Sequence, residues 1–159
     1  MNKNNYHQLK EELTSLLNEQ DSWLANLANA AAFLYHKLEK INWLGFYLYE
    51  QSEQYLMVGP FQGLPACSRI KVGSGVCGTA VKEKRTIRVG DVEKFPGHIV
   101  CDPRSRSEIV IPLLEGDKVF GVLDIDSSRL NRFSSTDQQQ LEQLVALITE
   151  TINLAEIAW

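Results

Sequence analysis

Three stretches of the chain repeat apolar residues at the three- and four-residue spacing of an amphipathic helix. The first spans 6–17. The second begins at Asp21 or Ser22, because either side chain can cap a helix N-terminus. The third begins at Ser134 or Ser135 and continues almost to the C-terminus. We therefore predict terminal helices that each bury one face.

The middle of the chain has the composition and alternation of strands. Residues 42–50 and 55–61 flank a polar turn, and 108–114 and 119–126 flank another, so each pair predicts an antiparallel hairpin. Three shorter elements are expected between the hairpins, namely a strand at 67–72, a helix at 76–84 and a strand at 86–89. Residues 90–106 show no period, and a loop of that length inside a domain is usually functional.

Side chains alternate between the two faces of a strand, so each predicted strand can be divided into two sets. One set is mainly aliphatic and consists of Leu44, Phe46, Leu48, Ile109, Ile111, Leu113, Val119, Gly121, Leu123 and Ile125. If this face packs on the helices, the other face presents Trp43, Tyr47, Glu108, Asp124 and Asp126. The pattern predicts an α+β fold, a mainly antiparallel sheet with the terminal helices on one face and a ligand pocket on the other.

The two aspartates have two interpretations at this point. Carboxylates two residues apart in an apolar strand repel each other unless a cation or hydrogen-bond donors meet them, so Asp124 and Asp126 favour a ligand amine. A sheet with one solvated face would show the same alternation.

Composition narrows the class of protein. With 159 residues, 44% hydrophobic and 23% charged, the chain is typical of one soluble domain, which we place at 1–159. The sequence has no apolar segment directly after its first residues and no run of about 18 apolar residues. We therefore expect a cytoplasmic protein with no membrane partner. A net charge of -4 without a basic stripe argues against nucleic acid.

Cys67, Cys77 and Cys101 fall within one short window. Cytosolic thiols are kept reduced, so clustered cysteines there suggest redox catalysis or metal binding. Two of them meeting across a loop would let one thiolate attack an oxidised substrate and the other form a disulfide. An odd number at irregular spacing is not a disulfide framework, however, and free cysteine is often a small buried hydrophobe.

Two further motifs have competing interpretations. The glycines of 73–78 fit the dinucleotide pattern, but they follow an antiparallel hairpin in a chain too short for a doubly wound sheet. A glycine turn that opens a helix instead leaves N–H groups free for a carboxylate and could lower the pKa of Cys77. His98 with Cys67, Cys77 and Cys101 could form a Cys₃His zinc site, although closely paired cysteines are missing.

Several motifs together resemble one family. They are 43–47, 59–63, 66–67, 73–78, 91–92, 95–102, 107–110 and 123–127. From about Tyr35 to the C-terminus the chain resembles the free methionine-(R)-sulfoxide reductases, which are enzymes built on a GAF domain. GAF domains in general share only a fold, and the three cysteines with Phe-Pro-Gly-His are the specific part. The resemblance implies reduction of free methionine (R)-sulfoxide.

The resemblance also implies roles for individual residues. Cys101 looks like the nucleophile, Cys67 the main resolving thiol and Cys77 an auxiliary one, while Glu108 would protonate the sulfoxide oxygen. Attack on sulfur would give methionine and a sulfenic acid, which condenses to a disulfide. Thioredoxin, supplied by NADPH through thioredoxin reductase, would reopen that disulfide, and no bound cofactor or metal is implied.

The remaining roles concern binding. Asp124 and Asp126 would hold the substrate ammonium, and Trp43 and Tyr47 would pack on its S-methyl end. Backbone N–H groups of the cysteine-bearing loops would take the carboxylate. A homodimer is expected because helices of GAF domains often pair. The alternatives are a GAF domain that senses a small molecule without catalysis, and the zinc site.

Overall fold

The computed structural model describes residues 3–157, so the two residues at each end of the predicted domain lie outside the described part. Within that part a six-stranded sheet has the order β3-β2-β1-β6-β5-β4, and its neighbouring strands run antiparallel. The strands are β1 (Trp43–Glu50), β2 (Tyr55–Gln62), β3 (Arg69–Lys71), β4 (Ile87–Val89), β5 (Ser107–Glu115) and β6 (Lys118–Ser127). Both predicted hairpins are confirmed.

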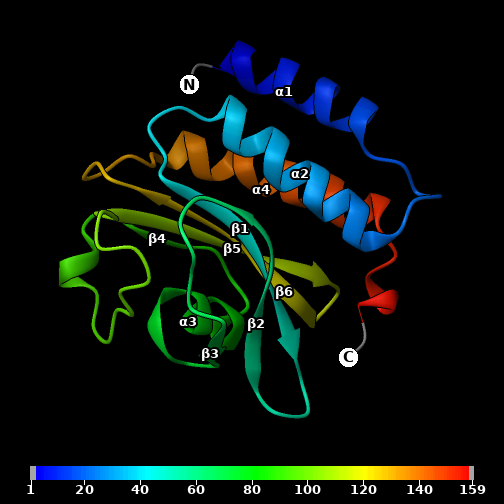
Figure 1. Ribbon diagram of the computed structural model, residues 1–159. Helices are drawn as coiled ribbons and strands as arrows, with labels where there is room; N and C mark the ends of the chain where they lie inside the picture. Colours follow the sequence, from blue (N-terminus) through cyan, green and yellow to red (C-terminus); the bar gives the residue numbers. More distant parts are fainter. Residues whose placement is uncertain (1–2, 158–159) are drawn as a thin grey trace.

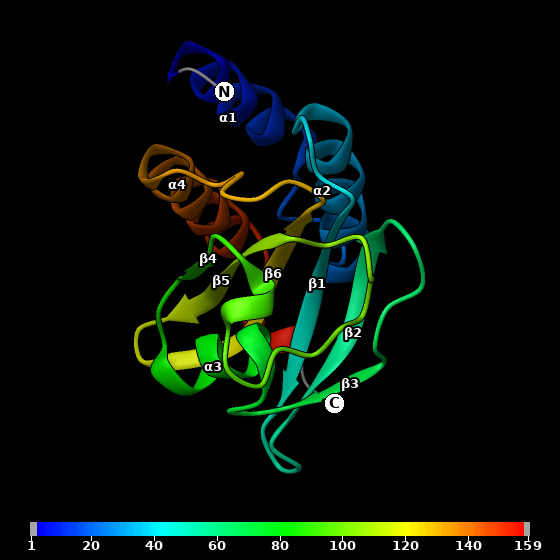
Figure 2. The same ribbon diagram turned by 90° about the vertical axis from the view of Figure 1, so that its left-hand side faces the viewer.

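Helices cover the two faces of this sheet unequally. The helices α1 (Lys3–Leu16), α2 (Trp23–Lys37) and α4 (Ser135–Thr151) lie together on one face (Figure 1). The short α3 (Gly75–Glu83) and the loop between β4 and β5 lie on the opposite face (Figure 2). Two turns of 3₁₀ helix follow β4 and α4, at Val92–Lys94 and Leu154–Glu156. No helix in the described range is both long and apolar enough to cross a bilayer.

The aliphatic face of the sheet forms the larger core with the terminal helices. Leu44 and Leu123 from the central strands and Leu34 and Leu144 from α2 and α4 are almost completely buried there. A smaller core on the other face contains Trp43. Apolar side chains along the central strands alternate between the two cores. The predicted division of the sheet into a helix-packed face and a second face is therefore confirmed.

The prediction was wrong at Val119, which packs in the smaller core, while Phe120 packs under the helices. The cause is a β-bulge, because Leu113 pairs with Gly121 and Leu114 pairs with Val119. One extra residue in β6 reverses the alternation from that point toward the hairpin. Asp124 and Asp126 lie on the other side of the bulge from the hairpin turn, so their side chains keep the predicted face.

Serine caps begin two of the helices, as expected from the sequence. Ser22 accepts a hydrogen bond from the backbone N–H of Ala25 at the start of α2. Ser134 caps α4 in a reciprocal capping box, because its hydroxyl accepts from the Asp137 N–H at 3.1 Å and the Asp137 carboxylate accepts from the Ser134 N–H at 2.9 Å. Both bonds satisfy N–H groups that the helix itself cannot pair.

We expect Ser134→Ala to lower the free energy of unfolding by about 1 kcal/mol, because alanine cannot accept the Asp137 N–H. The matched control is Ser135→Ala at the exposed first residue of α4, which should change stability by less than about 0.5 kcal/mol. Urea denaturation of the three proteins measures both values. Equal effects of the two substitutions would contradict the capping role.

Candidate active site

A disulfide joins two loops on the face opposite the terminal helices. Cys67 lies in the segment between β2 and β3, and Cys101 lies in the loop between β4 and β5. Their Cα atoms are 5.5 Å apart, and both residues are partly exposed. The structure thus brings together the two cysteines expected to act as nucleophile and resolving thiol.

The residue after Cys101 anchors its loop to the sheet. The buried Asp102 carboxylate accepts from Asn42 Nδ2 at 2.9 Å, and the Arg104 guanidinium donates to it at 2.7 Å. The Arg104 hydrogen bond lowers the pKa of Asp102 to about 2, so this side chain remains a carboxylate at neutral pH. The network fixes the position from which Cys101 faces the sheet.

Beneath the disulfide lies a small cavity with a volume of about 30 Å³. A space of that size holds about one or two waters. Cys101 lines the cavity, whereas Cys67 does not. The other lining residues are Ile70, Gly75, Val76, Cys77, His98, Ile99, Asp102, Ser105, Glu108, Asp124 and Asp126. The cavity wall is therefore strongly acidic, as the alternation predicted.

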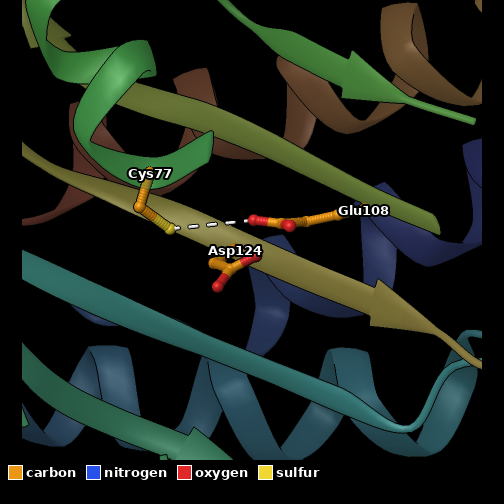
Figure 3. Close-up of side chains that lie close together, drawn as sticks. All are labelled: Cys77, Glu108 and Asp124. Carbon is orange, nitrogen blue, oxygen red and sulfur yellow. Dashed lines mark hydrogen bonds between the residues drawn. The ribbon is translucent and has the colours of Figure 1, made fainter. Parts of the chain in front are cut away.

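Three side chains from three elements converge in this wall (Figure 3). Cys77 comes from α3, Glu108 from β5 and Asp124 from β6, and each offers an atom within 4.8 Å of the others. Cys77 Sγ is 4.0 Å from Glu108 Oε1, at the limit of a weak thiol hydrogen bond. Asp124 Oδ1 is buried without a hydrogen-bond partner. Convergence of this kind is stable only if some of the acids hold protons.

Burial governs the acidity of the cluster. It raises the pKa of Glu108 well above its ordinary value, and the charge of Asp126 adds to the effect. It also raises the pKa of Asp124, with a further contribution from Glu108, and the pKa of Asp126, with a further contribution from Asp124. The cluster therefore favours carboxylic acids that can donate protons.

The suggestion that a helix N-terminus lowers the pKa of Cys77 was wrong. Cys77 is fully buried in the first turn of α3, and burial raises its pKa, followed by the charges of Asp124 and Glu108. Desolvation of the thiolate and two acidic neighbours outweigh the partial positive charge of the helix end. Cys77 is thus a protonated thiol in this form of the protein.

The two predicted aromatic residues lie beside the cavity and outside its lining. Tyr47 donates its hydroxyl to the carbonyl of Cys67 at 3.1 Å, and Trp43 Nε1 donates to the carbonyl of Leu64 at 3.0 Å. The Trp43 ring stacks against Tyr47 and against Phe61, at centroid distances of 5.8 and 5.4 Å. In this form the pair holds the segment that contains Cys67.

Comparison with known proteins supports one family. A model of the GAF domain matches residues 23–153. The free methionine-R-sulfoxide reductase of Escherichia coli is 48% identical, and the match covers 96% of this chain and 92% of that protein. The free methionine-R-sulfoxide reductase of Saccharomyces cerevisiae is 43% identical, and the match covers 91% of this chain and 83% of that protein. The X-ray structure of free methionine-R-sulfoxide reductase from Neisseria meningitidis in complex with its substrate has a TM-score of 0.90 at 40% identity, and covers 95% of this chain and 90% of that one.

The chain belongs to the GAF-domain family of free methionine-R-sulfoxide reductases. The predicted fold is confirmed as a GAF fold.

In this reductase fold the Cys₃His zinc alternative does not fit. Cys67 and Cys101 are bonded to each other, so neither sulfur is available as a ligand. Cys77, Glu108 and Asp124 offer atoms within 4.8 Å of one another, but Cys77 is the only member of the predicted zinc set among them. Burial raises the pKa of each of the three, which favours their protonated forms.

Sequence reasoning missed two features of the reductase site. One is the anchor formed by Asn42, Asp102 and Arg104, for which the Asp-Pro-Arg turn after Cys101 was the available signal. The other is His98, whose Nε2 lies 3.6 Å from Glu108 Oε2. The sequence had suggested His98 only as a zinc ligand, because its distance from Glu108 depends on how the long loop folds over the sheet.

We expect Cys77 to resist iodoacetamide in the folded, oxidised protein and to react after unfolding, because burial and the raised pKa suppress its thiolate. Peptide mass spectrometry measures the labelling, and the same map should show Cys67 linked to Cys101. Rapid labelling of Cys77 in the folded protein at neutral pH would contradict this description.

Proposed function

We propose that this chain reduces free L-methionine (R)-sulfoxide to methionine, with Cys101 as the nucleophile and Cys67 as the resolving thiol. The observation that supports this most is the Cys67–Cys101 disulfide directly beside the buried acid Glu108. A reductase of this chemistry needs both a thiol pair and a proton donor. Membership of the family supports the choice of substrate.

The first step takes place at Cys101, which lines the cavity together with Glu108. The Cys101 thiolate attacks the sulfoxide sulfur while Glu108 protonates the sulfoxide oxygen. The substrate sulfur gains two electrons and leaves as a thioether, and the oxygen remains on Cys101 as a sulfenic acid. The raised pKa of Glu108 favours this step because the carboxyl group keeps its proton to a higher pH than an exposed glutamate does.

The second step forms the observed disulfide. The Cys67 thiol displaces the sulfenic oxygen as water, so two thiols are oxidised for each sulfoxide reduced. Hydrogen bonds from Tyr47 and Trp43 to the segment around Cys67 support a precise position for this thiol. Cys77 is buried and protonated, which favours Cys67 as the first resolving residue and leaves Cys77 an auxiliary role.

Substrate binding follows from the acidic wall. Asp124 and Asp126 would pair with the substrate ammonium, and the unpartnered Asp124 Oδ1 is a ready acceptor for it. A cavity of about 30 Å³ is too small for the amino acid, so the disulfide form is closed. Reduction would release the Cys67 segment, and Trp43 and Tyr47 could then contact the S-methyl group as the sequence predicted.

Recycling requires an external dithiol. Cys67 is partly exposed and lies outside the cavity lining, whereas Cys101 lines it, so we propose that thioredoxin attacks Cys67 and releases Cys101 as the leaving thiolate. NADPH would supply the electrons through thioredoxin reductase. The scheme needs no bound cofactor. The homodimer and the cytoplasmic location stay predictions.

The proposed function is tested by incubating the protein with thioredoxin, thioredoxin reductase, NADPH and separated epimers of methionine sulfoxide. Only the free R epimer should drive NADPH oxidation. The kcat/KM for N-acetylmethionine R-sulfoxide should be about 10²-fold or more below that for the free R epimer, because Asp124 and Asp126 would face an amide in place of an ammonium. Tight binding of the R epimer without turnover would contradict the proposal and indicate a sensor.

We expect Cys101→Ser to release no methionine and Cys67→Ser to release about one methionine per site before it stalls with thioredoxin, because its sulfenic acid lacks the resolving partner. Cys77→Ser is the matched control and should keep turning over. Quantifying methionine against time separates the three. Sustained thioredoxin-dependent turnover by a variant that lacks both Cys67 and Cys77 would contradict the disulfide scheme.

A further inference from the structure

Proton supply to Glu108 is a step that the assigned residues leave open. Each turnover removes one proton from Glu108, which is buried, so the proton must return before the next substrate is protonated. The ionisable groups around Glu108 include Cys77 from α3, Asp124 and Asp126 from β6, Tyr47 from β1 and His98 from the loop before β5. These groups are the candidates for carrying a proton between Glu108 and solvent.

The geometry points to His98, and we propose that His98 is a proton relay that reloads Glu108 between turnovers. His98 Nε2 lies 3.6 Å from Glu108 Oε2, on the opposite side of the carboxyl group from the Cys77 contact at Oε1. The His98 side chain is 14% exposed and that of Glu108 is 7% exposed. His98 is thus in contact with the buried acid and is itself more exposed to solvent. This inference rests on the proposed function.

The chain holds His98 at this point through a tight turn. Phe95, Pro96, Gly97 and His98 form the turn, which closes with a backbone hydrogen bond from the His98 N–H to the Phe95 carbonyl. Gly97 has φ of 73°, a conformation that glycine adopts without strain at the third position of such a turn. The Phe-Pro-Gly-His motif therefore has a structural purpose, which is to aim His98 at the cavity.

The other neighbours of Glu108 are less suited to the task. Cys77 and Asp124 are buried, whereas His98 is partly exposed. Asp126 is partly exposed, but its proposed partner is the substrate ammonium. Burial lowers the pKa of His98 below its usual 6.5, so the imidazole is neutral at neutral pH and can both accept and donate a proton.

Glu108 gives its proton to the sulfoxide oxygen and becomes a carboxylate, which shortens the 3.6 Å gap to a charge-assisted hydrogen bond with His98. His98 takes a proton from solvent at Nδ1 and passes the one on Nε2 to Glu108 Oε2, which leaves a neutral imidazole protonated at Nδ1. Exchange with solvent returns the proton to Nε2 before the next turnover. The carboxylic acid and the neutral imidazole are then restored. No electrons move in this relay, and the dithiol supplies those of the main reaction.

The test separates the first turnover from later ones. Fully reduced His98→Ala protein, with Glu108 already protonated, should release its first methionine at the wild-type rate. Steady-state turnover with excess dithiothreitol should fall on the order of 10²-fold, the scale of a lost proton-transfer group. Added imidazole should restore the rate of His98→Ala and leave His98→Gln slow, because glutamine fills the space without titrating.

His36→Ala, at an exposed histidine of α2, is the matched control and should behave as wild type in both phases. Circular dichroism and the Cys67–Cys101 peptide map verify that each variant folds. Equal slowing of both phases, no slowing at all, or a rate that does not respond to imidazole would each overturn the relay. A wild-type protein that releases no methionine would instead overturn the proposed function.

Discussion

The pairing of β5 with β6 brings the carboxyl groups of the candidate site together. Glu108 lies opposite Asp126, and Val110 lies opposite Asp124, so three carboxyl groups share one patch of the sheet. A slip of one residue would turn them into the aliphatic core under α2 and α4. The bulge at Phe120 lies beyond this patch and leaves the register of the acids intact.

That register places three carboxyl groups close together under α3 and the loop before β5. Glu108 and Asp124 are buried and Asp126 is partly exposed, and the pKa values of all three rise because the charged forms are poorly solvated there. The disulfide closes the same space from above, and the Asp102 anchor keeps Cys101 facing it. Cys101, the proposed nucleophile, and Glu108, the proposed proton donor, therefore line one small cavity.

Local patterns in the sequence were sufficient for most of the fold. Alternation placed Glu108, Asp124 and Asp126 on the correct face, and the serines before α2 and α4 gave the starts of these two helices. Contacts between distant segments were beyond this reasoning. The Asn42 to Asp102 bond and the His98 to Glu108 contact join residues whose distance depends on the path of a long loop. Likewise, burial of Cys77 by tertiary packing reversed the effect expected from its helix.

The central claim is that Glu108 is a carboxylic acid at neutral pH in the folded protein. Nuclear magnetic resonance of ¹³C-labelled glutamate, with the signal assigned by Glu108→Gln, would follow its side-chain carboxyl group as the pH is changed. Because burial and Asp126 raise the pKa, the account predicts a titration midpoint well above 4.5, with the acid form predominant at neutral pH. A midpoint at or below 4.5 would contradict the proposed role of Glu108 as the proton donor.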